Sequence, residues 1–267
     1  MIRSVPKFTF ETMPTFHQLW ESCMEQHLTP TTDAVIRLLY SSVIDSGSKL
    51  LDTCVGGGGL AVELLGYTYD MTMADGDSGM LALFEKNALK KGLHKEGLYR
   101  KPILAKWQEF PSVFSGCQFD GLICCGNSLI YAGGYWNHDG VVDRQLALTG
   151  IRETLAIFRR LLVPGGHLFV DKPSDNEQPT EDLVACINVA GDVYDVFFSV
   201  RFAGDRRTAQ ILLRHQVTGE EMGTPNVAYR LKDSELEELL LQAGFASFER
   251  VAGGVNSHLP LWVARVL

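Results

Sequence analysis

The chain has 267 residues, of which 46% are hydrophobic and 21% are charged, a composition typical of folded globular proteins. Its formal net charge of −8 argues against nucleic acid as the main partner, because polyanions bind basic surfaces. The N-terminus lacks the apolar core of a signal peptide, and no apolar run reaches membrane-spanning length. The six cysteines form no CxxC pair, so we expect reduced, buried thiols in a cytoplasmic protein without a membrane partner.

The first part of the chain predicts helices and then an alternation of strands and helices. Residues 1–46 are expected to form a helical lid region, whose helix with Phe16 and Trp20 is equally well explained as a hydrophobic docking helix. Strands are expected over residues 49–55, 71–74, 102–105, 121–125 and 167–170, and helices over 60–65, 78–89 and 144–162. This alternation predicts an α/β fold with a doubly wound, mostly parallel sheet.

The pattern changes after residue 190, where strands follow one another directly. They are expected over residues 193–202, 209–217 and 226–231, with turn residues between them. A helix between Asp233 and Gly244 and two final strands, over 245–252 and 261–266, complete the chain. We therefore expect one domain over residues 1–267, with a β-rich insertion at 190–230.

The segment LLDTCVGGGG at residues 50–59 is the strongest local signal. A strand ends there, glycines allow a tight turn beside a ligand, and a helix begins. Gly56, Gly58 and Ala61 also fit the G-x-G-x-x-A pattern of nicotinamide-cofactor enzymes. The loop alone therefore does not identify the cofactor.

Two acids near this loop favour a nucleoside site. Asp52 lies late in the first strand, where it can face a cationic amino-acid group or hold the loop. Asp75 ends the next strand, where its two oxygens can accept hydrogen bonds from both ribose hydroxyls. A solvated strand end for Asp52 and a turn acid for Asp75 are the alternatives.

Several segments resemble a known enzyme family. LLDTCVGGGG resembles motif I of class I methyltransferases that use S-adenosylmethionine (SAM). MTMADGDSGMLALFEKNALKKG and FDGLICCGNSLIY resemble the corresponding segments of glycine and sarcosine N-methyltransferases, and LLVPGGHLFVD resembles their next turn and strand. The resemblance spans about residues 48–171. It implies a seven-stranded sheet, SAM as cofactor, and methyl transfer to a small molecule, preferably to the amine nitrogen of an amino-acid-like acceptor.

The resemblance also implies residue roles in binding SAM. Its methionine part would lie against the glycine loop and the first acid, its ribose on the second acid, and its methyl group near the end of the fourth strand. The residues expected to bind it are Asp52, Gly56, Gly58, Asp75, Gly76, Met80, Trp107, Cys125 and Gly126. Trp107 would flank the adenine, or serve as a core aromatic. Lys106 departs from the family, which usually has Asp or Asn there to recognise adenine.

The acceptor site departs from the family as well. The residues proposed for it are Asn127, Tyr131, Lys172, Tyr194 and Arg201. Asn127 is expected to contact the acceptor or to cap the strand end, and Tyr131 stands where the family tends to have histidine. Asp171-Lys172-Pro173 replaces a D-H-R-like triplet whose arginine binds the substrate carboxylate. Arg201 is the preferred substitute, although a solvated arginine is the simpler interpretation; Tyr194, seven residues earlier, would face the opposite side of a regular strand.

Methyl transfer from a sulfonium is an in-line displacement, so it requires positioning more than a side-chain nucleophile or a metal. His138 could act as a base, and Asp139 and Asp143 could bind a metal or a cationic substrate, but solvated loop residues are the simpler interpretation. The alternatives left open are an O-methyltransferase acting on an acid or phenol, an NAD(P)-dependent oxidoreductase, and a non-catalytic SAM-binding protein. Asp52 and the lack of a Tyr-x-x-x-Lys pair disfavour the oxidoreductase, and an oligomer is possible.

Overall fold

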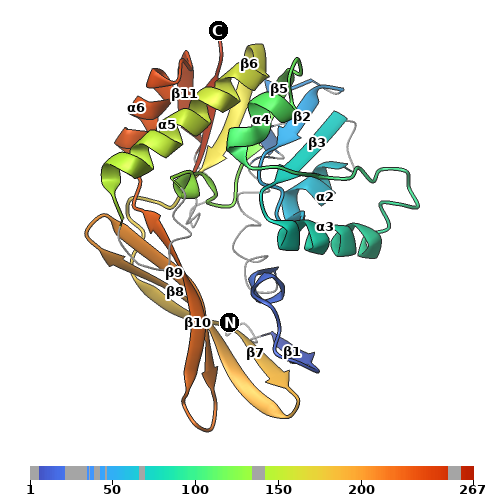
Figure 1. Cartoon of the computed structure of the whole chain (residues 1–267), viewed down its shortest axis with the longest axis vertical. Helices are drawn as coiled ribbons and strands as arrows, with labels where there is room; N and C mark the ends of the chain where they lie inside the picture. The colour runs from blue at the N-terminus through green and yellow to red at the C-terminus, as the bar shows by residue number, and fades with distance from the viewer. Residues whose placement is uncertain are drawn as a thin grey trace.

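The structure is a computed structural model that describes residues 6–21, 35, 37–38, 43–45, 47–65, 70–133, 142–251 and 260–267. Its strands form two sheets (Figure 1). One has seven strands in the order β11-β12-β6-β5-β2-β3-β4, and the other has five in the order β1-β7-β8-β9-β10. No helix of the described residues is long and apolar enough to cross a membrane.

The seven-stranded sheet contains most of the strands expected from the alternating part of the chain. Its strands are β2 (Lys49–Asp52), β3 (Asp70–Asp75), β4 (Ile103–Leu104), β5 (Phe119–Cys124), β6 (Leu162–Asp171), β11 (Ser247–Val251) and β12 (Leu261–Arg265). β2 pairs in parallel with β3 and β5, β5 with β6, and β3 with β4. β12 runs antiparallel to both of its neighbours, β6 and β11. The expected mostly parallel, seven-stranded sheet is confirmed.

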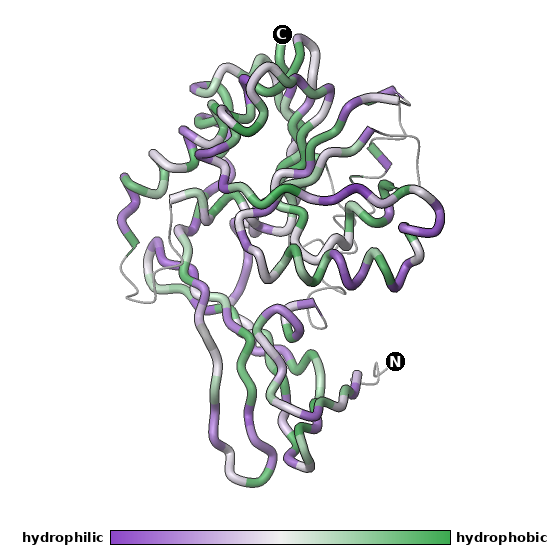
Figure 2. The backbone as a smooth tube through the Cα atoms, turned by 45° about the vertical axis from the view of Figure 1, so that its right-hand side comes forward, coloured by the Kyte–Doolittle hydropathy of each residue, from purple (hydrophilic) through white to green (hydrophobic). Residues whose placement is uncertain are grey.

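Helices cover both faces of this sheet. They are α2 (Gly59–Leu65), α3 (Ser78–Lys90), α4 (Phe110–Val113), α5 (Arg144–Leu161) and α6 (Asp233–Gln242), with short 3-10 turns η2 (Trp107–Glu109) and η3 (Leu129–Tyr131). Successive strand residues point to opposite faces. Leu51 and Leu122 accordingly join the core under α5 and α6, whereas Leu50 and Ile123 join the core under α2 and α3. The sheet is therefore doubly wound. In Figure 2 the colour of α3 alternates along its length, as expected of a helix with one buried face.

The five-stranded sheet extends away from this body (Figure 1). It consists of β1 (Lys7–Phe10), β7 (Thr180–Val189), β8 (Asp192–Ala203), β9 (Arg206–His215) and β10 (Glu221–Tyr229). β7 to β10 form an antiparallel meander, and β1 adds in parallel to β7. β8, β9 and β10 match the strands expected after residue 190, but the strands begin earlier, at Thr180. Neither β7 nor β1 was expected: β1 has only four residues and is specified by its partner strand.

The N-terminal segment contacts the five-stranded sheet and the start of α3. Residues 16–21 are helical, and Leu19 is buried with Ile187 and Tyr194 of the five-stranded sheet. The polar side of the same turn reaches α3, where His17 Nε2 lies 3.2 Å from the Asp77 carboxylate. Residues 22–34 of the expected helical region lie outside the described residues.

One glycine of α5 tests how closely this helix packs on the segment after η3. A Cβ at Gly150 would lie 2.7 Å from Gly133 Cα and 2.8 Å from the Ala132 carbonyl oxygen. We expect Gly150→Ala to lower the free energy of unfolding by about 1–3 kcal/mol through overpacking, despite the higher helix propensity of alanine. Gly59→Ala is the matched control, because a Cβ there meets nothing within 4 Å. Urea denaturation measures both, and equal stabilities would contradict the close packing.

Candidate functional site

The candidate site lies where parallel strands of the seven-stranded sheet end. Asp52 is paired with Met73 on one side and with Ile123 on the other, so the carboxyl ends of β2, β3 and β5 lie at one edge. Cys124 is paired with Val170, which places the end of β6 at the same edge. In open α/β sheets, ligands bind outside this edge. The residues that follow these strands are therefore the ones able to form a site.

The glycine loop between β2 and α2 rests on α3. Gly56 and Gly58 have φ angles of 54° and 89°, in the left-handed region that favours glycine. A Cβ at Gly58 would also lie 2.4 Å from Cδ2 of Phe84, so packing alone requires glycine there. Asn87 of α3 donates from Nδ2 to the Gly57 carbonyl oxygen at 3.0 Å. The sequence indicated the loop correctly, but the structure adds a packing reason for Gly58 that does not involve a ligand.

Asp75 links the glycine loop to the start of α3. Its Oδ2 accepts the Gly56 N–H at 2.8 Å, and its Oδ1 accepts the Asp77 N–H at 2.9 Å. Asp77 then caps α3 by accepting the N–H groups of Gly79 and Met80. Burial raises the pKa of Asp75 above its ordinary value. Because a carboxylate offers about four lone-pair sites, these backbone contacts leave Asp75 able to accept a further hydrogen bond from a ligand.

Asp52 is a buried carboxyl beneath the loop. Its Oδ1 accepts the Cys54 N–H at 3.1 Å. Burial raises its pKa to about 7, and the nearby negative charge of Asp75 adds to the rise. No lysine, arginine or histidine of the described residues forms an ion pair with Asp52. A buried carboxyl whose pKa is near neutrality and which has no cationic partner can bind a cationic ligand, and Asp52 is such a group.

The segment after β4 contributes Lys106 and Trp107. The Trp107 Nε1 donates to the Thr53 carbonyl oxygen at 2.7 Å, and its ring meets Phe158 edge-on at 5.7 Å. These contacts give Trp107 the core role considered above as the alternative to flanking adenine. A Cβ at Gly76 would lie 3.4 Å from Lys106 Cγ, so these two residues lie together beside Asp75.

Asp171 is a site residue that the sequence did not single out. It ends β6, is fully buried, and accepts the Gly126 N–H at 2.9 Å and the Asn127 N–H at 2.6 Å. Burial raises its pKa to about 7. The signal available in the sequence was its position, because Asp52 and Asp75 also end parallel strands. The resemblance to the D-H-R-like triplet concerned the arginine that Pro173 replaces, two residues after Asp171.

The turn that Asp171 holds comprises Cys125, Gly126 and Asn127. Asn127 has a φ of 64°, an uncommon conformation for a residue other than glycine. Its side chain is buried, and its Oδ1 accepts no hydrogen bond from any described residue. Cys54 Sγ donates to the Cys125 carbonyl oxygen at 3.2 Å, which joins this turn to the end of β2. A buried acceptor without a donor indicates a place for a ligand N–H or O–H.

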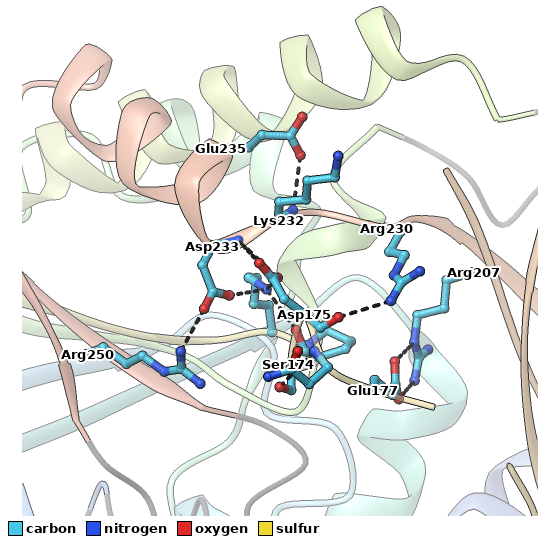
Figure 3. A network of polar contacts seen from close by, with 12 residues as sticks. Ser174, Asp175, Glu177, Arg207, Arg230, Lys232, Asp233, Glu235 and Arg250 are labelled. Atoms are coloured by element: carbon cyan, nitrogen blue, oxygen red, sulfur yellow. Dashed lines mark hydrogen bonds and ion pairs between the residues drawn. The ribbon is translucent and has the colours of Figure 1, made fainter. Parts of the chain in front are cut away.

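Tyr131 and Lys172 lie in buried polar surroundings on the side of the five-stranded sheet. Burial raises the pKa of Tyr131, and the charges of Arg207 and Glu177 also act on it. Arg207 Nε and Nη2 each donate to Glu177 at 2.8 Å (Figure 3). Lys172 is completely buried, and its Nζ lies 2.7 Å from Asp175 Oδ1.

The ion cluster around Lys172 extends to α6. Lys172 Nζ also lies 2.5 Å from Asp233 Oδ1, and Arg250 Nη1 lies 2.7 Å from Asp233 Oδ2. Figure 3 shows Asp233 between Arg250 and Asp175, with contacts to both. Lys172 is therefore occupied by two carboxylates, and binding of an acceptor by Lys172 would require breaking this cluster.

The other expected acceptor residues lie on the five-stranded sheet. Tyr194 is buried against His215, with ring centroids 5.0 Å apart. Arg201 is exposed on the opposite face and pairs with Glu181 at 3.3 Å, which matches the solvated alternative. The opposite orientation of Tyr194 and Arg201 agrees with their spacing.

The expected loop candidates have separate outcomes. The Asp143 carboxylate caps α5 by accepting the Leu146 N–H at 2.9 Å. His138 and Asp139 lie outside the described residues. Among the described residues, no group of three or more His, Cys, Asp and Glu side chains could hold a metal ion.

Comparisons with known proteins support the fold. No protein-family model and no curated protein matches the sequence. A SAM-dependent methyltransferase from Clostridium acetobutylicum has a similar structure, with a TM-score of 0.65 at 13% identity over 94% of this chain and 97% of that chain. The sugar N-methyltransferase KedS8 from Streptoalloteichus is similar with a TM-score of 0.67 at 17% identity over 96% and 95%.

A third similar structure has SAM bound. This is CalS10, an amino pentose methyltransferase from Micromonospora echinaspora, with a TM-score of 0.61 at 16% identity over 90% of this chain and 91% of that chain. At these identities the likeness concerns the fold. The chain therefore has the class I fold of SAM-dependent methyltransferases over nearly its whole length.

Proposed function

We propose that this protein is a SAM-dependent methyltransferase that methylates a small molecule, preferably at an amine nitrogen. The observation that carries the proposal is the set of acids Asp52, Asp75 and Asp171, each at the carboxyl end of a parallel strand around the glycine loop. SAM is a cation at its sulfonium and its ammonium group, and it carries a ribose diol. Asp52 and Asp171 are buried without an ion-pair partner among the described residues, and Asp75 is partly buried. Such a site suits a cation that carries a diol better than it suits a dinucleotide, whose pyrophosphate is anionic.

Asp52 and Asp75 have distinct roles in this proposal. Asp52 faces the cationic methionine end, where a positive charge lowers the cost of its ionisation. Asp75 holds the ribose hydroxyls with its remaining acceptor sites while keeping the loop in place through Gly56. Gly58, Gly76 and Met80 complete the cofactor side, as the family resemblance implies. When bound, SAM supplies an activated methyl group, and the protein supplies orientation and exclusion of water.

The acceptor lies on the far side of the methyl group, next to the turn after β5. We assign its anchoring to Asn127 and Tyr131. The Asn127 Oδ1 accepts an N–H from the acceptor amine, which directs the nitrogen lone pair toward the methyl carbon. We do not assign this role to Lys172 or Arg201, because each is engaged by carboxylates.

Transfer to nitrogen also agrees with what similar structures are described to do. KedS8 is described as a sugar N-methyltransferase, and MtfA as a glycopeptide N-methyltransferase. The segments that resemble glycine and sarcosine N-methyltransferases favour an amino-acid-like amine among such acceptors. The contacts of the N-terminal helical turn with the five-stranded sheet and with the cap of α3 support its proposed role as a lid over the site.

Cofactor identity is tested by calorimetry. We expect SAM and its product S-adenosylhomocysteine (SAH) to bind with dissociation constants on the order of 1 μM, about −8 kcal/mol, and NAD and NADP to show no comparable binding. Asp75→Ala should weaken SAM binding by about 1.5–3 kcal/mol for each lost ribose hydrogen bond. Asp70→Ala, at the exposed start of the same strand, is the control and should bind normally. Binding of NAD without SAM would overturn the proposal.

The acid under the loop gives a pH dependence with a definite sign. In the free protein the pKa of Asp52 is about 7, so its carboxyl is mostly neutral at pH 6 and mostly ionised at pH 8. A sulfonium prefers the ionised form, so the affinity ratio of SAM to SAH should rise severalfold as the pH increases through 7. The ratio cancels the amino group that both ligands share. Asp52→Asn should flatten the rise, and an unchanged pH profile in this variant would remove Asp52 from the site.

A further inference from the structure

In its ionised form, Asp171 carries a negative charge that no cation of the described residues balances. Its side chain is completely buried, and its two oxygens accept backbone N–H groups from Gly126 and Asn127. Lys172, the next residue, directs its ammonium to Asp175 and Asp233 instead. Burying a carboxylate without a cation is costly, and two hydrogen bonds offset only part of that cost.

The surroundings of Asp171 place this charge at the acceptor side of the site. Its charge acts on the Cys125 thiol, and so does the charge of Asp52. Cys125 therefore lies near two acids, Asp52 under the glycine loop and Asp171 beside the turn after β5. The unpartnered Asn127 Oδ1 belongs to the same turn that Asp171 holds. The acceptor side thus presents a carboxylate and an amide oxygen, and both favour a positively charged or N–H-bearing ligand.

The charge balance of methyl transfer gives this arrangement a purpose. As the acceptor nitrogen lone pair forms a bond to the methyl carbon, the C–S bond breaks and its electron pair stays on sulfur. A neutral amine becomes an ammonium, so the positive charge moves from sulfur to nitrogen. A fixed negative charge placed where this ammonium forms stabilises the transition state more than the reactants. A carboxylate or phenolate acceptor would instead be repelled by it.

We propose that Asp171 is a positioning residue that holds the Gly126–Asn127 turn and supplies the negative charge facing the ammonium formed on the acceptor, so that the site selects neutral amines and rejects anionic oxygen acceptors. This inference rests on the proposed function. It assigns the choice between nitrogen and oxygen transfer to the end of β6.

The test uses a probe and needs no identified acceptor. Sinefungin resembles SAM but carries an amino-substituted carbon in place of the methylated sulfur, so it places an ammonium where the methyl group is transferred. SAH has a neutral sulfur there. By calorimetry at pH 8, Asp171→Asn should lower the affinity ratio of sinefungin to SAH by about tenfold, the size of one hydrogen bond to a charged group. Its affinity for SAH should stay close to that of the wild type.

Two variants separate this charge effect from a purely structural role. Asp175→Asn changes an acid of the adjoining loop that pairs with Lys172, and it should leave the ratio unchanged. Asn127→Gly relieves the left-handed strain at that position, so the turn depends less on Asp171. Adding Asp171→Asn to Asn127→Gly should still lower the ratio, measured against Asn127→Gly alone.

The outcomes distinguish the inference from the function on which it rests. A ratio that Asp171→Asn leaves unchanged overturns the inference, and so does a decrease that disappears in the Asn127→Gly background. In both cases SAM and SAH would still bind to the wild-type protein. A wild-type protein that binds none of the three ligands overturns the proposed function, and the inference with it.

Discussion

Parallel pairing of β2 with β5, and of β5 with β6, places Asp52 and Asp171 at one edge of the sheet, on the two sides of the β5 terminus. The rest of the site depends on this register. A slip of one residue would turn each acid to the other face. The glycine loop, held by Asp75, and the acceptor turn, held by Asp171, then close around the same point. In both the glycine loop and the turn after β5, a carboxylate holds the backbone by accepting its N–H groups. The negative charge of these carboxylates also suits a cationic ligand.

The five-stranded sheet and the N-terminal segment enclose this edge from the other side. Leu19 packs on the five-stranded sheet, while His17 reaches the cap of α3 next to Asp75. The Lys172 cluster connects the end of β6 to the start of α6, and the Arg207–Glu177 pair lies close to it (Figure 3). Buried ion pairs add little net stability, but removing one partner is costly because it leaves the other charge buried and unpaired. These pairs therefore fix the position of the end of β6.

Local patterns in the sequence were enough to predict the central sheet, because short apolar runs alternate with helical segments, one of them clearly amphipathic. They were also enough to place Asp52 and Asp75 at strand ends, because both residues follow such runs. Long-range contacts were not readable. Asp171 accepts two backbone N–H groups from the turn after β5, Lys172 pairs with Asp233, and Arg201 pairs with Glu181 on the neighbouring strand. β1 is a strand only because β7 is beside it.

Methyl transfer itself is the most direct measurement. The protein is incubated with SAM labelled in its methyl group and with a panel of small amines, carboxylic acids and phenols, and the label in each product is counted. We predict transfer to one or more amines, with none to acids or phenols. Transfer to an acid or phenol alone would contradict the charge argument for Asp171, and SAM binding without transfer to any member of a broad panel would contradict the enzymatic function.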